Sequence, residues 1–238
     1  GPLKESEEER RDRSVRVLRA LRKQYPDAHV PLRYSNPLEL MIATILSAQC
    51  TDERVNQVTK PLFRKYRKAA DWAKTDVRTL EEEIRPTGFF RSKAKAIHQS
   101  TSELVERYDG RVPDTLEELT SLRGIGRKTA NVILAHAFDK QGIIVDTHYI
   151  RISRRLGLTR EFDPVRIEFD TMWFLPERHW SEFSLLITWH GRKICPARKP
   201  DCPDCPVRKL CPAADSRGEV TWKVKSPPSR PRRRKTSG

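Results

Sequence analysis

Residues 122–130 read Leu-Arg-Gly-Ile-Gly-Arg-Lys-Thr-Ala, so a pair of glycines directly precedes a stretch with helical character. Glycine allows a tight turn and lets backbone N–H groups come close to a phosphate. The N-terminus of the following helix adds the positive end of the helix dipole. Gly124 and Gly126 therefore predict a helix-hairpin-helix that contacts a nucleic-acid backbone without reading its sequence. An ordinary turn between two helices has the same G-x-G pattern, so the motif alone leaves both interpretations open.

Helical periodicity extends outward from this hairpin over nearly the whole chain, without a convincing alternating strand pattern. A charged leader over residues 1–15, which we expect to be flexible, precedes a first helix that contains Leu18, Leu21 and Tyr25 and ends near Pro26. Further helices are predicted over residues 36–46, 51–66, 79–84, 92–108, 115–122, 127–138, 147–156, 164–174 and 180–191. Helices this short are unstable alone, so the pattern predicts an all-α protein that packs into a bundle or two lobes.

A second pattern lies near the C-terminus, where Cys195, Cys202, Cys205 and Cys211 have the spacing C-x6-C-x2-C-x5-C. Four thiolates can hold a tetrahedral zinc ion or a 4Fe-4S cluster. Zinc modules usually offer two C-x2-C pairs, whereas here one such pair is flanked by single cysteines on loops that contain proline. The spacing therefore favours a 4Fe-4S cluster over zinc. Both are favoured over disulfides, because we expect the thiols to stay reduced inside the cell.

The overall charge indicates the kind of partner. The chain has 47 Lys and Arg against 32 Asp and Glu, a formal net charge of +15, which favours a polyanion and nucleic acid first of all. We expect residues 213–238 to form a basic, disordered tail that either adds nonspecific phosphate affinity or is simply solvated. No apolar run is long enough to span a membrane, and no signal peptide is recognisable. These features predict an intracellular protein without a membrane partner, cytoplasmic and associated with the nucleoid if the source is bacterial. We also expect it to be a monomer.

Four further stretches follow one another in a specific order. They are Leu46–Asp52 (LSAQCTD), Gly88–Ala94 (GFFRSKA), Val145–His148 (VDTH) and His190–Arg192 (HGR). Together with the glycine hairpin and the cysteines, they resemble the motifs of bacterial-type endonuclease III, a family of the helix-hairpin-helix DNA glycosylase superfamily. The resemblance covers roughly residues 16–212.

The resemblance implies a two-lobed helical fold. A six-helix domain over residues 33–141 would contain the hairpin, and residues 16–32 and 142–212 would form an iron-sulfur cluster domain. The active site would lie in the cleft between the two domains, and the cluster would be a 4Fe-4S cluster bound by the four cysteines. The partner would be double-stranded DNA that contains a damaged base or an abasic site.

The resemblance also implies the chemistry, which is that of a bifunctional DNA glycosylase and abasic-site lyase of base excision repair that removes oxidised pyrimidines. Lys128 matches the family's nucleophile, which attacks the sugar C1′ and forms a Schiff base before β-elimination. Asp146 matches its carboxylate partner. From the spacing alone, Lys128 would be a phosphate ligand like Arg127, and Asp146 would be a helix N-cap. Because a lysine must be neutral to attack, we expect Lys128 to be buried in the cleft, near the helix dipole.

The remaining expectations concern DNA contacts. Gln49 and Phe89 match the family positions that fill the gap left by an extruded base, although Phe89 stands where an aliphatic wedge is commoner. Gln49 offers both a donor and an acceptor to the unpaired base. Without the resemblance, Phe89 would be interpreted as a core residue. Further DNA contacts are expected from Arg123, Gly124, Gly126, Arg127, His148, Arg198 and Lys199.

Two other functions stay open at this point. An adenine-specific or mismatch-specific monofunctional glycosylase shares the cysteine spacing but normally lacks the lysine nucleophile. A noncatalytic DNA-binding redox module would need neither Lys128 nor Asp146. The presence of both residues in their motifs favours the bifunctional enzyme.

Overall fold

The structure, a computed structural model, describes residues 5–214, in which every regular element is a helix. The prediction of an all-α protein is confirmed. The α-helices are α1 (Glu7–Gln24), α2 (Pro37–Leu46), α3 (Asp52–Lys65), α4 (Ala69–Lys74), α5 (Val77–Ile84), α6 (Phe90–Tyr108), α7 (Leu116–Ser121), α8 (Arg127–Ala137), α9 (Thr147–Arg155), α10 (Pro164–Phe174) and α11 (Trp180–Lys193). Short 3-10 helices occupy η1 (Arg85–Thr87), η2 (Glu177–His179) and η3 (Arg208–Leu210).

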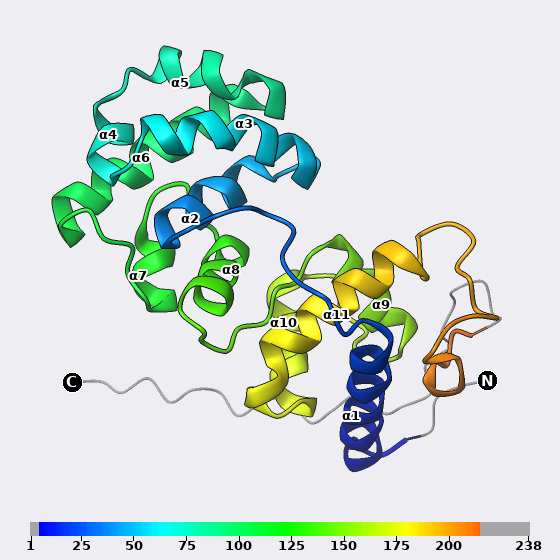
Figure 1. Ribbon diagram of the computed structural model, residues 1–238. Helices are drawn as coiled ribbons and strands as arrows, with labels where there is room; N and C mark the ends of the chain where they lie inside the picture. Colours follow the sequence, from blue (N-terminus) through cyan, green and yellow to red (C-terminus); the bar gives the residue numbers. More distant parts are fainter. Residues whose placement is uncertain (1–4, 215–238) are drawn as a thin grey trace, which may run out of the picture.

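The helices gather into two lobes (Figure 1). The first lobe holds α2 to α8 around one apolar core, in which Trp72, Leu80 and Ile97 are among the buried side chains. It contains one α-helix more than the six expected, because α4 is present. The six residues of α4 are too few to show a helical period in the sequence, yet Ala69 and Trp72 are buried there. Tertiary packing therefore stabilises this helix, although the sequence contains no periodic signal for it.

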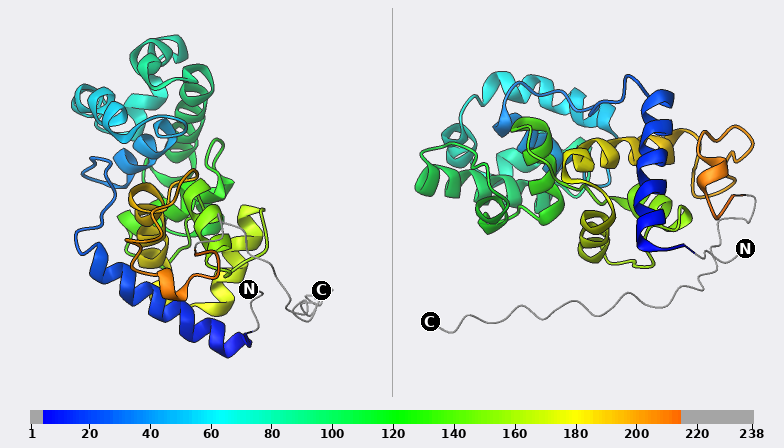
Figure 2. Two further views of the ribbon diagram at one scale, coloured as in Figure 1. Left: turned by 90° about the vertical axis from the view of Figure 1, so that its right-hand side faces the viewer. Right: turned by 90° about the horizontal axis from the view of Figure 1, so that it is seen from below.

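The second lobe joins distant parts of the chain. Helix α1 packs against α10 and α11 (Figure 2). Val17, Leu18 and Leu21 therefore enter the same core as Phe183 and Ile187. Along the chain, the buried residues change from one core to the other between Tyr25 and Leu32, and change back between Leu134 and Ile143. Two chain crossings thus connect the lobes.

The expectation of a flexible leader is wrong from Glu7 onward. Ser6 and Glu9 form a reciprocal capping box that starts α1, and three acidic residues in the first turn complement the helix dipole. Ser14 is fully buried and donates a hydrogen bond to Phe174 O at 3.3 Å, which holds this part of α1 against α10. Of the predicted basic tail, residues 215–238 lie outside the described residues.

Candidate active site and cysteine site

The glycine hairpin connects α7 to α8, and its two glycines differ in their surroundings. Gly124 has a φ of +84°, and a Cβ there would lie 2.7 Å from Ala96 Cβ, so both backbone and space require glycine. Gly126 has a φ of −85° and caps α8, and no atom lies within 4 Å of the place a Cβ would take. The turn itself therefore requires glycine at position 124 but not at position 126. Its openness instead leaves room for a ligand beside the backbone at the start of α8.

Lys128 is the second residue of α8 and is exposed, so the expectation that it is buried is wrong. It lies at the wall of a cleft of about 210 Å³. The lining side chains come from both lobes, with Thr44, Lys128 and His136 from the first and Asp146, Ser184, Thr188 and Arg192 from the second. The cleft therefore lies between the lobes.

Asp146 enters this cleft as the N-cap of α9. Its Oδ1 accepts a hydrogen bond from Tyr149 N at 2.7 Å, and its Oδ2 accepts one from Thr188 Oγ1 at 3.1 Å. The N-cap interpretation is confirmed, and the second bond ties the carboxylate to α11. A half-buried carboxylate with a fixed orientation thus shares the cleft with an exposed amine.

An ion pair crosses the same cleft. Arg192 Nη1 on α11 lies 3.1 Å from Asp52 Oδ2 at the start of α3, and both side chains line the cleft. Sequence reasoning assigned no role to either residue. Both stand in the quoted motifs, Asp52 at the end of LSAQCTD and Arg192 at the end of HGR, which is the signal that could have indicated them.

Arg127 is held by a partner within the protein. Its guanidinium forms a bidentate pair with Glu168 on α10, with distances of 2.6 and 2.9 Å, and the Glu168 side chain is only 4% exposed. The Glu168 partner raises the pKa of Arg127. This pair fixes the first turn of α8 against the second lobe. The structure thus places the half-buried Arg127 in an ion pair between the lobes, whereas a free phosphate ligand was expected.

The two expected gap-filling residues both project from the surface in strained backbone conformations. Gln49 has a φ of 50° and Phe89 a φ of 47°, in the left-handed region that side chains seldom adopt. Phe89 is 63% exposed, so its interpretation as a core residue is wrong. Strain of this kind persists where the surrounding structure enforces it, often at functional sites.

The other residues expected at the DNA have mixed surroundings. Arg123 is exposed and pairs with Glu103, with 3.3 Å between Nε and Oε1. His148 is half-buried beside Arg151, with 3.0 Å between Nδ1 and Nη2. Burial lowers the pKa of His148, and the charge of Asp146 opposes this effect. Arg198 and Lys199 are exposed on the loop after Cys195.

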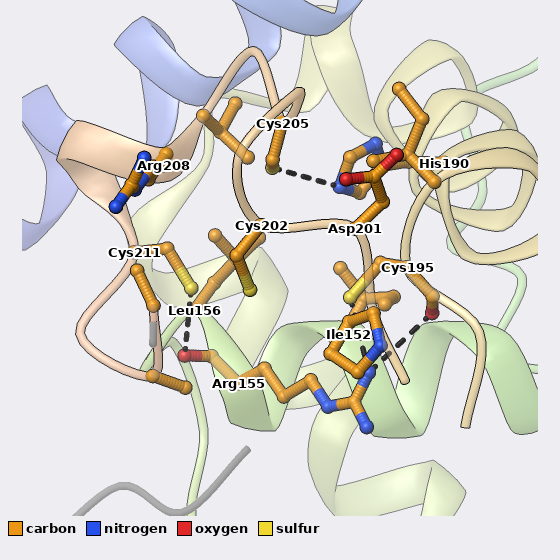
Figure 3. A pocket seen from close by; sticks show the side chains of 15 residues that line it. Ile152, Arg155, Leu156, His190, Cys195, Asp201, Cys202, Cys205, Arg208 and Cys211 are labelled. Carbon is orange, nitrogen blue, oxygen red and sulfur yellow. Dashed lines mark hydrogen bonds between the residues drawn. The ribbon is translucent and has the colours of Figure 1, made fainter. Parts of the chain in front are cut away.

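The four cysteines line one pocket beside Arg155 and His190 (Figure 3). Arg155 Nη1 donates to Cys195 Sγ at 3.1 Å, and Cys211 Sγ donates to Arg155 O at 3.4 Å. Burial raises the pKa of Cys205, and that of Cys211 to about 11. Within residues 5–214, no three His, Cys, Asp or Glu side chains have a spacing that would already hold a metal ion. All five cysteines of the chain are free thiols.

None of the helices in residues 5–214 is both long and apolar enough to cross a lipid bilayer.

Two helical lobes meet at a cleft that contains a lysine, and a glycine hairpin leads into the helix that carries this lysine. These features define the class of helix-hairpin-helix DNA-repair proteins. Residues 42–176 match the family described as HhH-GPD superfamily base excision DNA repair protein, and the chain belongs to this family. The chain is 50% identical over 208 residues to endonuclease III of Synechocystis sp., covering 87% of this chain and 95% of that relative.

Two solved structures are similar to most of the chain. A non-covalent endonuclease III–DNA complex has a TM-score of 0.82 at 41% identity, covering 87% of this chain and 97% of that one. A trapped endonuclease III–DNA covalent intermediate has a TM-score of 0.83 at 41% identity, covering 88% of this chain and 99% of that one. The resemblance found in the sequence is therefore confirmed.

Proposed function

We propose that this protein is a bifunctional DNA glycosylase and abasic-site lyase of base excision repair that removes oxidised pyrimidines from duplex DNA. The observation that carries the proposal is the meeting of Lys128 and Asp146, from different lobes, in one cleft. The relatives named endonuclease III and the two DNA complexes support the same activity. The DNA substrate places the proposed activity inside the cell, in the cytoplasm if the source is bacterial.

Lys128 is the nucleophile of the proposed reaction. Its neutral Nζ attacks the sugar C1′, the bond from C1′ to the base breaks, and the base leaves with the bonding electrons and takes up a proton. The nitrogen then loses a proton, the C1′–O4′ bond opens and O4′ takes up a proton, which gives the Schiff base. The Schiff base makes a C2′ proton acidic, and loss of that proton breaks the C3′–O bond and expels the 3′ phosphate. Lys128 is exposed in the free protein, so we expect bound DNA to cover the amine before it reacts.

Asp146 stabilises the positive charge that develops on the sugar during base loss. Its carboxylate is already oriented by Tyr149 N and Thr188 Oγ1, so little reorganisation is needed when that charge appears. The same orientation suits the acceptance of a proton or the alignment of a water molecule. Asp146 therefore acts electrostatically, and Lys128 makes the covalent bond.

DNA is held by its backbone and opened at the lesion. The hairpin N–H groups beside Gly126 and the exposed Arg198 and Lys199 contact phosphates. Gln49 and Phe89 occupy the gap after the damaged nucleotide has left the stack. Arg123 and His148 make further contacts with the DNA. Arg127 acts indirectly, because its pair with Glu168 holds the start of α8 in place.

We further propose that Cys195, Cys202, Cys205 and Cys211 hold a 4Fe-4S cluster. The donor set fits such a group, because four free thiols line one pocket and the backbone carbonyls of their loop are fixed by Arg155. The cluster would supply a fixed crosslink of the loop rather than a site for substrate, because all four irons would already have a thiolate ligand. The loop that carries Arg198 and Lys199 would thereby be ordered.

A panel of duplexes tests the proposed activity. Each duplex holds one oxidised pyrimidine, or adenine opposite an oxidised guanine, or a thymine mismatch, and base release and strand cleavage are measured separately. We expect base release and strand cleavage together on the oxidised pyrimidines. Asp146→Asn should slow base release by about 10²-fold or more, a size typical of lost electrostatic stabilisation. Base release without strand cleavage, confined to the adenine or mismatch duplexes, would instead identify a monofunctional glycosylase.

A further inference from the structure

A lysine that the proposed mechanism does not use is buried beneath the two gap-filling residues. Lys93 on α6 is only 4% exposed. Its Nζ donates to Leu46 O at 2.9 Å and to Thr87 O at 2.8 Å. Leu46 is the last residue of α2, and Thr87 is the last residue of η1. One ammonium group therefore joins the ends of two helical segments that are far apart in sequence.

The two carbonyls take the place of a counter-ion. No carboxylate within residues 5–214 forms an ion pair with Lys93, although burial of an unpaired charge is costly. The last carbonyls of a helix lack partners within the helix and carry the negative end of its dipole. The end of α2 at Leu46 therefore favours a cation, and Thr87 O, at the end of the three-residue η1, adds a second acceptor for it. Burial still lowers the pKa of Lys93, and Cys50 opposes this effect.

Both joined segments lead directly into the strained residues. Gln49 follows Leu46 by three positions, and Phe89 follows Thr87 by two. Lys93 N also donates to Phe89 O at 3.1 Å, but this is the first helical hydrogen bond of α6, which any residue at position 93 would form, so only the Nζ contacts are specific to lysine. Left-handed backbone at a residue other than glycine needs surroundings that enforce it. The contacts of Lys93 Nζ with Leu46 O and Thr87 O hold the segments that lead to Gln49 and Phe89, and so restrain both residues together.

The sequence pattern agrees with a buried role for this lysine. Ile97, Ser100 and Leu104 follow Lys93 at intervals of four, seven and eleven residues and are all fully buried on the same face of α6. A cation at a core position of an amphipathic helix is uncommon and needs a specific reason. Here the reason is the pair of helix ends that converge on it.

We propose that Lys93 is a positioning residue that joins the Gln49 and Phe89 loops into one rigid unit for insertion into duplex DNA. The inference rests on the proposed function, because it assigns Gln49 and Phe89 to the gap beside an extruded nucleotide. Lys93 itself touches neither the base nor the sugar. Its removal should impair filling of the gap while leaving phosphate contacts in place.

Gap filling can be measured separately from catalysis. In a Lys128→Gln background, which leaves the DNA intact, the protein is added to saturation to a duplex that carries the fluorescent base 2-aminopurine opposite an oxidised pyrimidine. Insertion unstacks the reporter and raises its fluorescence. Lys93→Met should abolish most of this rise, whereas the half-saturating protein concentration should change by less than about threefold, because phosphate contacts carry most of the affinity. Lys93→Gln, which keeps one donor group, should lie between Lys93→Met and the parent.

A matched variant controls for general loss of stability. Ile97→Val removes one methylene from a fully buried residue on the same helix without touching either loop, so it should keep the full fluorescence rise. When Gln49→Ala and Phe89→Ala are already present, Lys93→Met should add little, because residues that act through one another are not additive. If Lys93→Met does not fold, Lys93→Gln provides the same comparison.

The outcomes separate this inference from the proposed function. A full fluorescence rise in Lys93→Met, an equal loss in Ile97→Val, or no rise in the parent would overturn the role of Lys93. The proposed function is tested in the same series by borohydride trapping of the protein that retains Lys128 on an abasic-site duplex. Normal trapping together with a full fluorescence rise in Lys93→Met would reject the positioning role of Lys93 and leave the proposed function standing. Failed trapping would reject the proposed function, whatever the fluorescence shows.

Discussion

Gly124 and Gly126 stand two residues apart in the hairpin but serve different purposes. At Gly124, both the positive φ and the backbone of Ala96 exclude a side chain. At Gly126, the fold would accept a methyl group, since the surrounding space is empty. The difference separates a requirement of folding from a requirement of DNA binding.

Alanine substitutions should therefore have opposite effects at these two positions. Gly124→Ala should lower the free energy of unfolding by about 1–3 kcal/mol, because the new methyl group meets Ala96 in a strained conformation. Gly126→Ala should leave stability nearly unchanged and weaken DNA binding, because its methyl group occupies the space beside the N–H groups that a phosphate would need. Urea unfolding and fluorescence anisotropy with labelled DNA measure the two effects. Equal loss of stability in both variants would contradict this division.

His136 provides a test of pH dependence at a single residue. It lines the cleft, and burial lowers its pKa from the usual 6.5. The folded state therefore resists protonation while the unfolded state takes up a proton as the pH falls through 6.5, so this contribution to stability is present above 6.5 and is lost on acidification. In His136→Gln, the drop in unfolding free energy between roughly pH 8 and pH 5 should be smaller than in the parent. Urea unfolding at the two pH values measures this decrease. A decrease in His136→Gln as large as that in the parent would contradict the contribution assigned to His136.

At the scale of elements, the sequence predicts the long helices well and the short or context-dependent ones poorly. Asn36 and Pro37 mark the start of α2, and the structure has the expected cap, with Glu39 N donating to Asn36 Oδ1 at 2.9 Å. Helix α4 has no such periodic signal. The first two turns of α1 look like a solvated charged leader in sequence, and only contact with α10 reveals their buried side.

The site shows the same limit. The lysine and the carboxylate can be found in sequence because each stands in a recognisable motif. The Asp52–Arg192 pair joins residues 140 positions apart, and the exposure of Lys128 depends on how the lobes meet. Those facts are tertiary, so no local pattern contains them.

The cysteine loop is the element whose order should depend most on its ligand. Purified protein should be brown, with visible absorption from thiolate bound to iron. Cys202→Ser or Cys205→Ser should sharply lower the soluble yield, because metal binding contributes to folding free energy. Cys50→Ser, which changes a cysteine outside this pocket, serves as the matched control and should keep both colour and yield. Colourless protein with stoichiometric zinc would contradict the cluster.

At the scale of the whole molecule, the charge of +15 should govern DNA affinity. Affinity is expected to fall about tenfold or more for each few-fold rise in salt, because phosphate contacts release counterions. Arg198→Ala and Lys199→Ala should each reduce the slope of log affinity against log salt by about 1. Arg22→Ala, which removes an exposed cation paired with Glu182, should leave that slope unchanged. Binding titrations at several salt concentrations provide the comparison. An affinity that does not depend on salt would be inconsistent with binding through phosphate contacts.

The two lobes are brought together by contacts that also place the reacting groups. The Arg127–Glu168 pair holds α8, which carries Lys128, against α10, while Thr188 on α11 holds Asp146. The assignment of Lys128 as the nucleophile is therefore the central claim about the whole molecule. It predicts a covalent bond at one defined atom.

Borohydride trapping with peptide mapping tests this claim most directly. Protein is incubated with an abasic-site duplex and borohydride, and the crosslinked peptide is identified by mass spectrometry. We expect the reduced adduct on Nζ of Lys128, no trapping with Lys128→Gln despite retained DNA binding, and appreciable trapping with Asp146→Asn, since no base remains to be expelled. An adduct on another amine, or trapping by Lys128→Gln as efficient as that of the parent, would show that the nucleophile has been misassigned.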